Sequence, residues 1–175
     1  SMPSFFSNPG NSDEEKIQKL NAFIKRIDEI ERPDIIIIQI PGAMLKYNDL
    51  IPNGYGINAF LLAQAVTPDY CLCCIHSDVA YEEFVNSINE AFLYKYGYEI
   101  DYIHVSNYTI DYQYIINNNA ISGSYYPLDY VDEHIEKLNL SGDIPFYDLH
   151  NQEQLQKMYQ HFKSQLFEKN VMGVI

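Results

Sequence analysis

The sequence predicts an α/β fold, a layered domain in which helices flank a mainly parallel sheet. Two observations predict it. Short continuous apolar runs, "IIII" at 35–38 and "DYCLCCIH" at 69–76, are typical of strands that are buried on both faces. Segments with apolar residues at helical spacing alternate with these runs along the chain. Such alternation is typical of a parallel sheet with helices packed on its faces.

The N-terminal part divides into a lead-in, a helix, a strand and a loop. Residues 1–11 are rich in Pro, Gly, Ser and Asn, which predicts a flexible lead-in, and we expect residues 12–175 to form a single α/β domain. Ser12 and Glu15 form a capping box for a helix that Pro33 stops. Residues 34–40 are then expected as a central strand, followed by a long loop over 41–56.

The rest of the chain continues the alternation. The pattern predicts, in order, a helix over 57–66, a second central strand over 69–75, a helix that starts near Ser77 or Asp78 and ends at Gly97, a third strand within 98–107, a helical or extended segment over 111–121, a helix over 128–138, a short strand within 144–149, and a last helix capped by Asn151 and Gln154. We expect 34–40 and 69–75 to be neighbours in the sheet.

Charge and hydropathy exclude several partners. The 175 residues carry a net charge of −13, and nucleic acids and anionic membranes both require a basic face. The acidity suits a cationic peptide partner, or it is the ordinary charge of a solvated surface. No apolar run approaches the roughly 20 residues that a membrane-spanning helix needs, and the polar start has no signal-peptide pattern. We therefore expect a cytoplasmic protein.

Three cysteines lie within one apolar run, at Cys71, Cys73 and Cys74. An odd number of cysteines in such a run favours reduced, buried and unpaired thiols. Cys71 and Cys74 have C-x-x-C spacing, but in a strand their side chains point to opposite faces, which disfavours a redox or zinc role.

The segment "DIIIIQIPG" at 34–42 resembles the second phosphate-site strand of P-loop GTPases and ATPases. In that family an aspartate at the end of the strand holds Mg²⁺, and here Gln39 replaces it. A neutral amide does not offset the charge of a divalent ion as a carboxylate does. No G-x-x-x-x-G-K-[ST] motif is present to cradle phosphates. The resemblance therefore implies a P-loop-NTPase-like frame without Walker A and without autonomous NTP hydrolysis.

Ligands of open α/β sheets bind beyond the carboxyl ends of the strands. Polar and glycine residues follow the predicted strands or precede a predicted helix, where free backbone N–H groups favour anions. The predicted ligand-binding crevice is lined by Gln39, Pro41, Gly42, Asn53, Gly54, Gly56, Ser106 and Asn107.

Evidence for catalytic or metal-binding motifs is weaker. The five histidines make no H-E-x-x-H or H-x-x-x-H pattern, so a zinc hydrolase is not expected. His76 and Asp78 lie two residues apart after a strand and are the weak candidates for a metal site; a turn with a helix cap at Asp78 is the alternative. We assign no catalytic residue and expect no cofactor, except a nucleotide if an upstream region or a partner chain supplies the phosphate loop.

Three segments together carry a wider resemblance: "EEKIQKLNAFIKRIDEIERPDIIIIQIPGAM", "NGYGINAFLLAQAVTPDY" and "YKYGYEIDYIHVSN". Over about residues 5–115 the chain resembles the C-terminal part of a clostridial peptide-maturation protein found with bacteriocin-like modified peptides. Ala43 departs from the second glycine of the family pattern. The matching residues are Pro41, Gly42, Asn53, Gly56, Gln64, Pro68, Asp69, Ser106, Asn107 and Asp111.

The resemblance implies an accessory binding or scaffold module in the maturation of a ribosomally made peptide. Its expected partners are the precursor peptide or other maturation proteins. The alternative is a nucleotide- or metal-dependent enzyme whose phosphate loop lies in a missing N-terminal region or in a partner chain.

Overall fold

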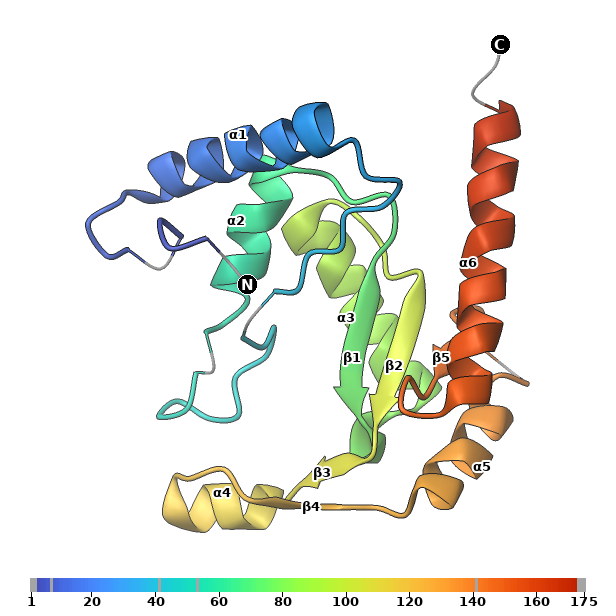
Figure 1. The fold of residues 1–175 in the computed structure, drawn as a ribbon. Coiled ribbons are helices and arrows are strands. Elements are labelled where there is room, and N and C mark those ends of the chain that lie inside the picture. The colour runs from blue at the N-terminus through green and yellow to red at the C-terminus, as the bar shows by residue number, and fades with distance from the viewer. Residues whose placement is uncertain (1–2, 7, 41, 53, 141, 173–175) are drawn as a thin grey trace. The chain divides into compact units, whose positions relative to one another are not determined.

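A computed structural model describes residues 3–6, 8–40, 42–52, 54–140 and 142–172, with backbone alone for 167–172. The chain forms two compact units. Figure 1 labels the helices and strands of both. The first contains residues 1–69, 91–98 and 112–121, and the second contains residues 70–90, 99–111 and 122–175. A single domain over residues 12–175 stays a prediction.

The first unit is built on two helices, α1 (Asp13–Glu31) and α2 (Ile57–Ala65). The capping box predicted at Ser12 and Glu15 is present, with both reciprocal bonds formed. Residues from both helices join the N-terminal segment in an apolar cluster of buried side chains: Phe6, Leu20, Leu61, Leu62 and Ala65. The Asn21 side chain also donates to the Ala65 carbonyl at 2.7 Å, which ties α1 to the end of α2.

Residues 34–40 form no strand, so the prediction of a central strand there was wrong. The segment is extended and alternates: Ile38 and Ile40 pack against the apolar cluster, whereas Ile37 is 90% exposed. The described strands all belong to the second unit, so this segment has no strand to pair with in its own unit. A run of β-branched residues favours an extended backbone but does not by itself provide a hydrogen-bonding partner.

The loop predicted over 41–56 is a loop in its described residues. Gly42, Gly54 and Gly56 all have positive φ, at 96°, 76° and 74°. The loop folds back on itself, because the Gly56 N–H donates to the Ala43 carbonyl at 2.8 Å. Gly56 then caps α2 in the left-handed conformation, which a glycine adopts without steric cost.

The second unit contains a three-stranded parallel sheet in the order β1 (Leu72–His76), β2 (Tyr102–Ser106) and β5 (Phe146–Tyr147). The register pairs Cys74 of β1 with His104 of β2, and His104 with Tyr147 of β5. The helix α3 (Glu82–Tyr96) follows β1 through a short 3₁₀ turn, η1 (Ser77–Val79), and ends at Gly97 as predicted. The strand β2 is buried along most of its length.

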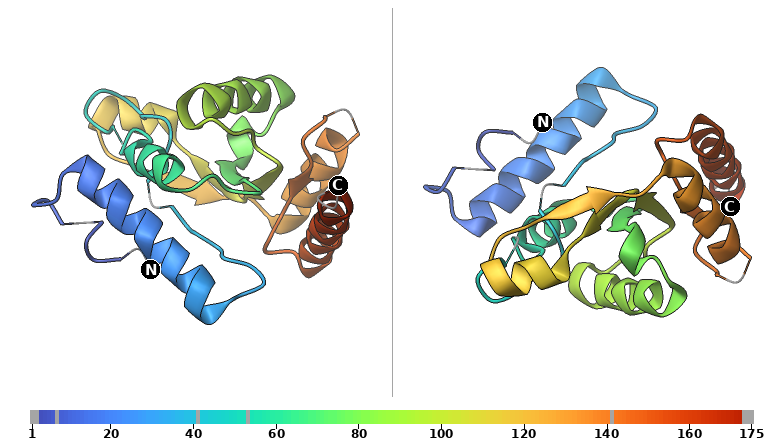
Figure 2. Two further views of the ribbon diagram at one scale, coloured as in Figure 1. Left: turned by 90° about the horizontal axis from the view of Figure 1, so that it is seen from above. Right: turned by 90° about the horizontal axis from the view of Figure 1, so that it is seen from below.

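Two further helices pack against this sheet, α5 (Leu128–Leu138) and α6 (Gln152–Met172). Figure 2 shows them together on a different side of the strands from the part of α3 that belongs to this unit, residues 82–90. The last helix covers the face of β2 and β5 that carries two tyrosines: Tyr102 packs edge-on against His161 of α6, and the Tyr147 hydroxyl lies 3.1 Å from the His161 Nδ1. Asn151 caps α6, as predicted, by accepting the Glu153 N–H.

A two-stranded antiparallel ribbon, β3 (Tyr108–Ile110) with β4 (Gly123–Tyr125), was not predicted. The ambiguous stretch between these strands is a helix, α4 (Tyr112–Asn118), which belongs to the first unit. The chain is therefore α/β, with a small parallel sheet flanked by helices. Within the described residues, no helix is both long enough and apolar enough to cross a membrane.

Candidate metal centre

Three ligand-type side chains converge beside the carboxyl end of β5. Asp148 follows β5 directly, His150 lies two residues later in the turn before α6, and His104 lies on the neighbouring strand β2. One donor atom from each of them lies within 4.8 Å of the other two. The turn forms because the Asp148 side chain accepts the His150 backbone N–H at 2.8 Å, a common local bond of aspartate in turns.

Asp148 is the most unusual member of the cluster. Its side chain is 0% exposed, and its Oδ1 accepts from the His150 backbone and lies 3.1 Å from the His150 Nδ1. Its second oxygen, Oδ2, is buried and has no hydrogen-bond partner. A buried carboxylate oxygen without a partner is costly, because it has lost its water and gained nothing in exchange.

His104 is held by the backbone of the strand beside it. It is 8% exposed, and its Nδ1 lies 3.2 Å from both the Tyr147 carbonyl oxygen and the Leu149 nitrogen. Burial lowers the pKa of His104, since it disfavours the charged ring, although the Tyr147 carbonyl and Asp148 oppose the shift. The Leu149 backbone N–H donates to this Nδ1, while the Tyr147 carbonyl would accept a proton from it, so two backbone groups of opposite character hold the ring in place. A backbone carbonyl is a common outer partner of a histidine that binds a metal.

His150 supplies the solvent side of the cluster. Its side chain is 58% exposed, and its ring centroid lies 5.3 Å from that of His104. Two imidazoles and a carboxylate are a ligand set that suits zinc and other divalent transition metals. Because three protein ligands leave a tetrahedral ion one open position, the exposed side at His150 is where a further ligand would enter.

A hydrogen-bond network from α5 and α6 supports Asp148. The Gln154 Oε1 accepts the Asp148 backbone N–H at 2.8 Å, and the Gln154 amide donates to the Asp132 carboxylate. Asn151 donates to the other Asp132 oxygen at 2.7 Å. Outer partners of this kind fix the orientation of ligands.

The residues of the predicted crevice fall in different parts of the chain. Gln39, Gly42, Gly54 and Gly56 belong to the first unit, whereas Ser106 and Asn107 belong to the second. Pro41 and Asn53 lie outside the described residues. In the first unit Gly42 and Gly54 lie side by side, with the Gly42 Cα 3.9 Å from where a Gly54 Cβ would stand. A common crevice stays a prediction.

Ser106 and Asn107 have local bonds that shape the ribbon. The Ser106 hydroxyl accepts the Tyr108 N–H at 3.2 Å, and the Asn107 amide donates to the Tyr126 carbonyl at 3.2 Å. These bonds hold the start of β3 against the residue that follows β4.

The weak metal candidates His76 and Asp78 lie at the carboxyl end of β1. The His76 Nδ1 and the Asp78 Oδ1 are buried without a hydrogen-bond partner, and so is the Ser77 Oγ between them. Among the described residues, they do not join a third ligand in a metal-sized group. The His76 ring packs edge-on against Tyr108, with ring centroids 5.6 Å apart.

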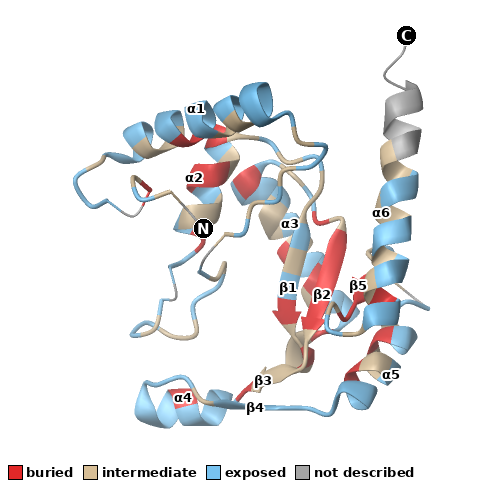
Figure 3. Cartoon of the chain, in the orientation of Figure 1, coloured by how far each residue is buried: buried red, intermediate tan, exposed pale blue. Residues whose placement is uncertain are grey.

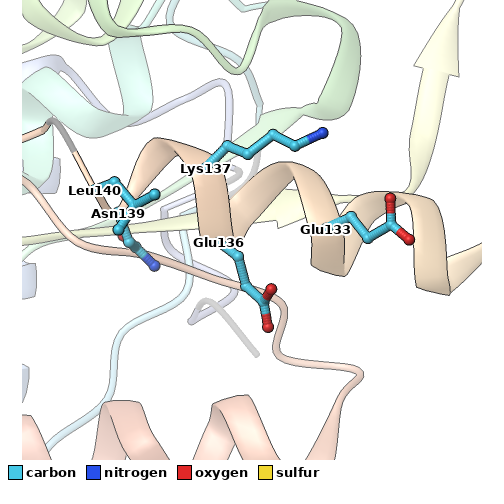
Figure 4. Close-up of a pocket in the computed structure, with 5 residues that line it drawn as sticks. All are labelled: Glu133, Glu136, Lys137, Asn139 and Leu140. Carbon is cyan, nitrogen blue, oxygen red and sulfur yellow. The ribbon is translucent and has the colours of Figure 1, made fainter.

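A surface depression near the end of α5 is not a second site. Figure 4 shows its lining, with Glu133, Glu136 and Lys137 extending from the helix. Asn139 in this lining bonds both the N–H and the carbonyl of Phe146, each at 2.8 Å, so its amide already has a structural role.

Comparisons with protein-family models, with curated proteins and with solved structures found no match for this chain. The P-loop-like frame inferred from the sequence thus has no support from a structural neighbour.

The sequence analysis missed this cluster because one of its three residues is distant in the chain from the other two. The signal that was present is the D-x-H spacing of Asp148 and His150, directly after a predicted strand. The third member, His104, lies in a strand more than forty residues earlier, and neither segment alone predicts that β2 pairs with β5.

Proposed function

We propose that this chain binds a divalent transition-metal ion through His104, Asp148 and His150. The observation that carries the proposal is the buried Asp148 carboxylate, which forms a cluster with two imidazoles and whose Oδ2 has no hydrogen-bond partner. A cation would offset the buried charge and use the free lone pair. The mixed nitrogen and oxygen donor set favours zinc-type ions over Mg²⁺, which prefers oxygen ligands alone.

The three residues of the centre would have different roles, because two of them are buried and one lies at the surface. Asp148 and His104 are buried and fixed by the backbone and by Gln154, so they would set the position of the ion. His150 lies at the surface and would complete the site next to solvent. A zinc ion with an open position acts as a Lewis acid and lowers the pKa of bound water.

The test is a calorimetric titration of metal-free protein with zinc. We expect one zinc ion per chain, and at 100 times Kd a stabilisation of about 2.7 kcal/mol. His150→Ala should abolish most of the binding with little loss of fold, because this side chain is largely exposed. His134→Ala is the matched control, since His134 bonds the Ala80 carbonyl outside the cluster. Equal zinc binding by the parent and His150→Ala would reject the proposal, as would full competition by Mg²⁺.

A second candidate function comes from the sequence resemblance. We propose that the chain acts as an accessory binding or scaffold module in the maturation of a ribosomally made peptide, without autonomous NTP hydrolysis. The resemblance of residues 5–115 and the absence of a Walker A motif support this role. The exposed edge of β4, with its tyrosines, favours a peptide partner. Incubation with ATP or GTP and Mg²⁺ tests the second part: we expect no turnover above buffer.

A further inference from the structure

The strand β4 has an open edge. It pairs with β3 on one side, and no other described strand pairs with it on the other. All three of its residues are exposed, and Tyr125 is 73% exposed. Figure 3 shows the strand as exposed along its length, in contrast to the buried β2. An open edge presents unpaired N–H and C=O groups to any extended chain that approaches it.

The register shows which backbone groups face outward. The ladder is bonded from the Tyr126 N–H to the Asn107 carbonyl, and from the Asp111 N–H to the Ser122 carbonyl. Bonded and non-bonded pairs alternate in an antiparallel ribbon. Tyr125 and Gly123, which stand opposite Tyr108 and Ile110, are therefore non-bonded positions. Their N–H and C=O groups point away from β3 and toward the open edge.

Aromatic side chains extend this edge. The Tyr125 ring packs edge-on against Tyr108 across the ribbon at 5.1 Å. Just beyond β4, the rings of Tyr126 and Tyr130 pack together, also at 5.1 Å. Exposed tyrosines provide contact area at a small entropy cost. The edge therefore offers both main-chain bonds and side-chain contacts to an extended partner.

The charge around the edge selects the partner. Between Lys95 and Lys137 the sequence contains no Lys or Arg, and the exposed carboxylates of Asp111 and Asp129 follow the ends of β3 and β4. A second copy of the chain would bring another net charge of −13 to the same place. Like charges oppose such an association, whereas a basic segment is attracted.

We propose that the open edge of β4 binds an extended cationic peptide, which adds a strand to the β3–β4 ribbon. Main-chain bonds from Gly123 and Tyr125 would align the peptide, and the acidic surroundings would favour lysine or arginine side chains. This mode of binding is the addition of a strand to a sheet edge. It rests on the second proposed function, the binding of a peptide, and is independent of the candidate metal centre, because none of the residues at this edge belongs to that cluster.

Two substitutions at one position isolate the main-chain contribution. Tyr125→Ala removes the ring but keeps the outward N–H, whereas Tyr125→Pro removes that N–H as well. The β3–β4 ladder does not use this N–H, so both variants should keep the ribbon. The probe is a short fluorescent peptide of alternating lysine and valine, and its binding is measured by fluorescence anisotropy. We expect Tyr125→Pro to bind it about five- to tenfold more weakly than Tyr125→Ala.

Modified peptides provide a test that needs no protein variant. The same peptide with N-methylated backbone amides, and a glutamate–valine peptide, should both bind the parent protein poorly, and added salt should weaken binding of the lysine peptide. Equal binding by Tyr125→Pro and Tyr125→Ala together with unchanged binding of the N-methylated peptide would overturn the proposal. A dimer in sedimentation that Tyr125→Pro dissociates would also overturn it, because the occupant of the edge would then be a second copy.

Discussion

The side-chain oxygen of Gln154 accepts the backbone N–H of Asp148 at 2.8 Å, so a residue in the first turn of α6 fixes the backbone of the candidate metal centre. Gln154 is itself anchored, because its amide donates to Asp132 on α5. The centre therefore depends on the packing of two helices as well as on the sheet.

Replacing Gln154 should weaken zinc binding without removing a ligand. We expect Gln154→Leu to lower zinc affinity about tenfold, the lower end of the range found for outer partners of metal ligands. The control is Gln156→Leu, the same substitution at an exposed position of the same helix. Zinc calorimetry on both variants checks the prediction, and equal affinities would show that Gln154 does not position Asp148.

Zinc should reverse the order in which the parent and Asp148→Asn resist unfolding. In metal-free protein we expect the variant to be at least as stable as the parent. The asparagine amide is neutral, so the variant does not bury a carboxylate charge next to an atom without a hydrogen-bond partner. Zinc at 100 times Kd should stabilise the parent by about 2.7 kcal/mol and leave the variant unchanged, so that the parent becomes the more stable of the two. Urea unfolding midpoints in chelator and in zinc provide the comparison. A metal-free variant that is much less stable than the parent would contradict it.

Gly123 should not tolerate a side chain. A Cβ there would clash with the Thr109 carbonyl oxygen and lie 2.6 Å from the Tyr108 ring. We expect Gly123→Ala to lower the free energy of unfolding by about 1–3 kcal/mol, the usual cost of overpacking. Gly142→Ala is the control, because the nearest atom to its Cβ would lie at 3.5 Å. Similar thermal midpoints for both variants would argue against the described ribbon.

Neighbouring isoleucines should respond differently to the same substitution. Ile37 is exposed, so Ile37→Asn should change the free energy of unfolding by less than about 0.5 kcal/mol. Ile38 packs against the apolar cluster, so Ile38→Asn should cost about 1–2 kcal/mol. Chemical denaturation of both variants decides between this arrangement and a strand buried on both faces, in which the two costs would be alike.

The cysteines should react with alkylating reagents at different rates. They are free, as predicted, but the expectation that all are buried was wrong: Cys74 is exposed, and Cys71 and Cys73 are half-buried. Burial raises the pKa of Cys71 and of Cys73 to about 12. At pH 8 about one in ten thousand of these thiols is then ionised. Burial raises the pKa of Cys74 too, but the residue is exposed to the reagent.

Iodoacetamide labelling followed by peptide mass spectrometry measures the three rates. We expect Cys74 to react first, and the rates at Cys71 and Cys73 to rise about tenfold per pH unit from pH 8 to pH 11, because the thiolate is the reactive form. Equal rates at all three positions would show that burial does not protect Cys71 and Cys73.

Helix positions were largely predictable from the sequence, because local signals determine them. The capping box at Ser12, the stop at Gly97 and the cap at Asn151 each depend on residues within one turn of the helix end. Strand pairing depends on residues distant in the chain, and this is where the prediction failed. The isoleucines at 35–38 and the cysteine-containing run at 71–74 look alike in sequence, but the second has a partner strand and the first has none.

The division of the chain has a consequence for how this protein can be cut or recombined. The boundaries between the two units fall near residues 69, 90, 98, 111 and 121, so each unit is assembled from several separate stretches. No single cleavage point releases either unit whole, and a gene fragment that encodes 70–175 still carries two stretches that belong to the other unit. Recombination at one boundary therefore cannot transfer the complete gene segment for either unit, and the two units would be inherited and selected together.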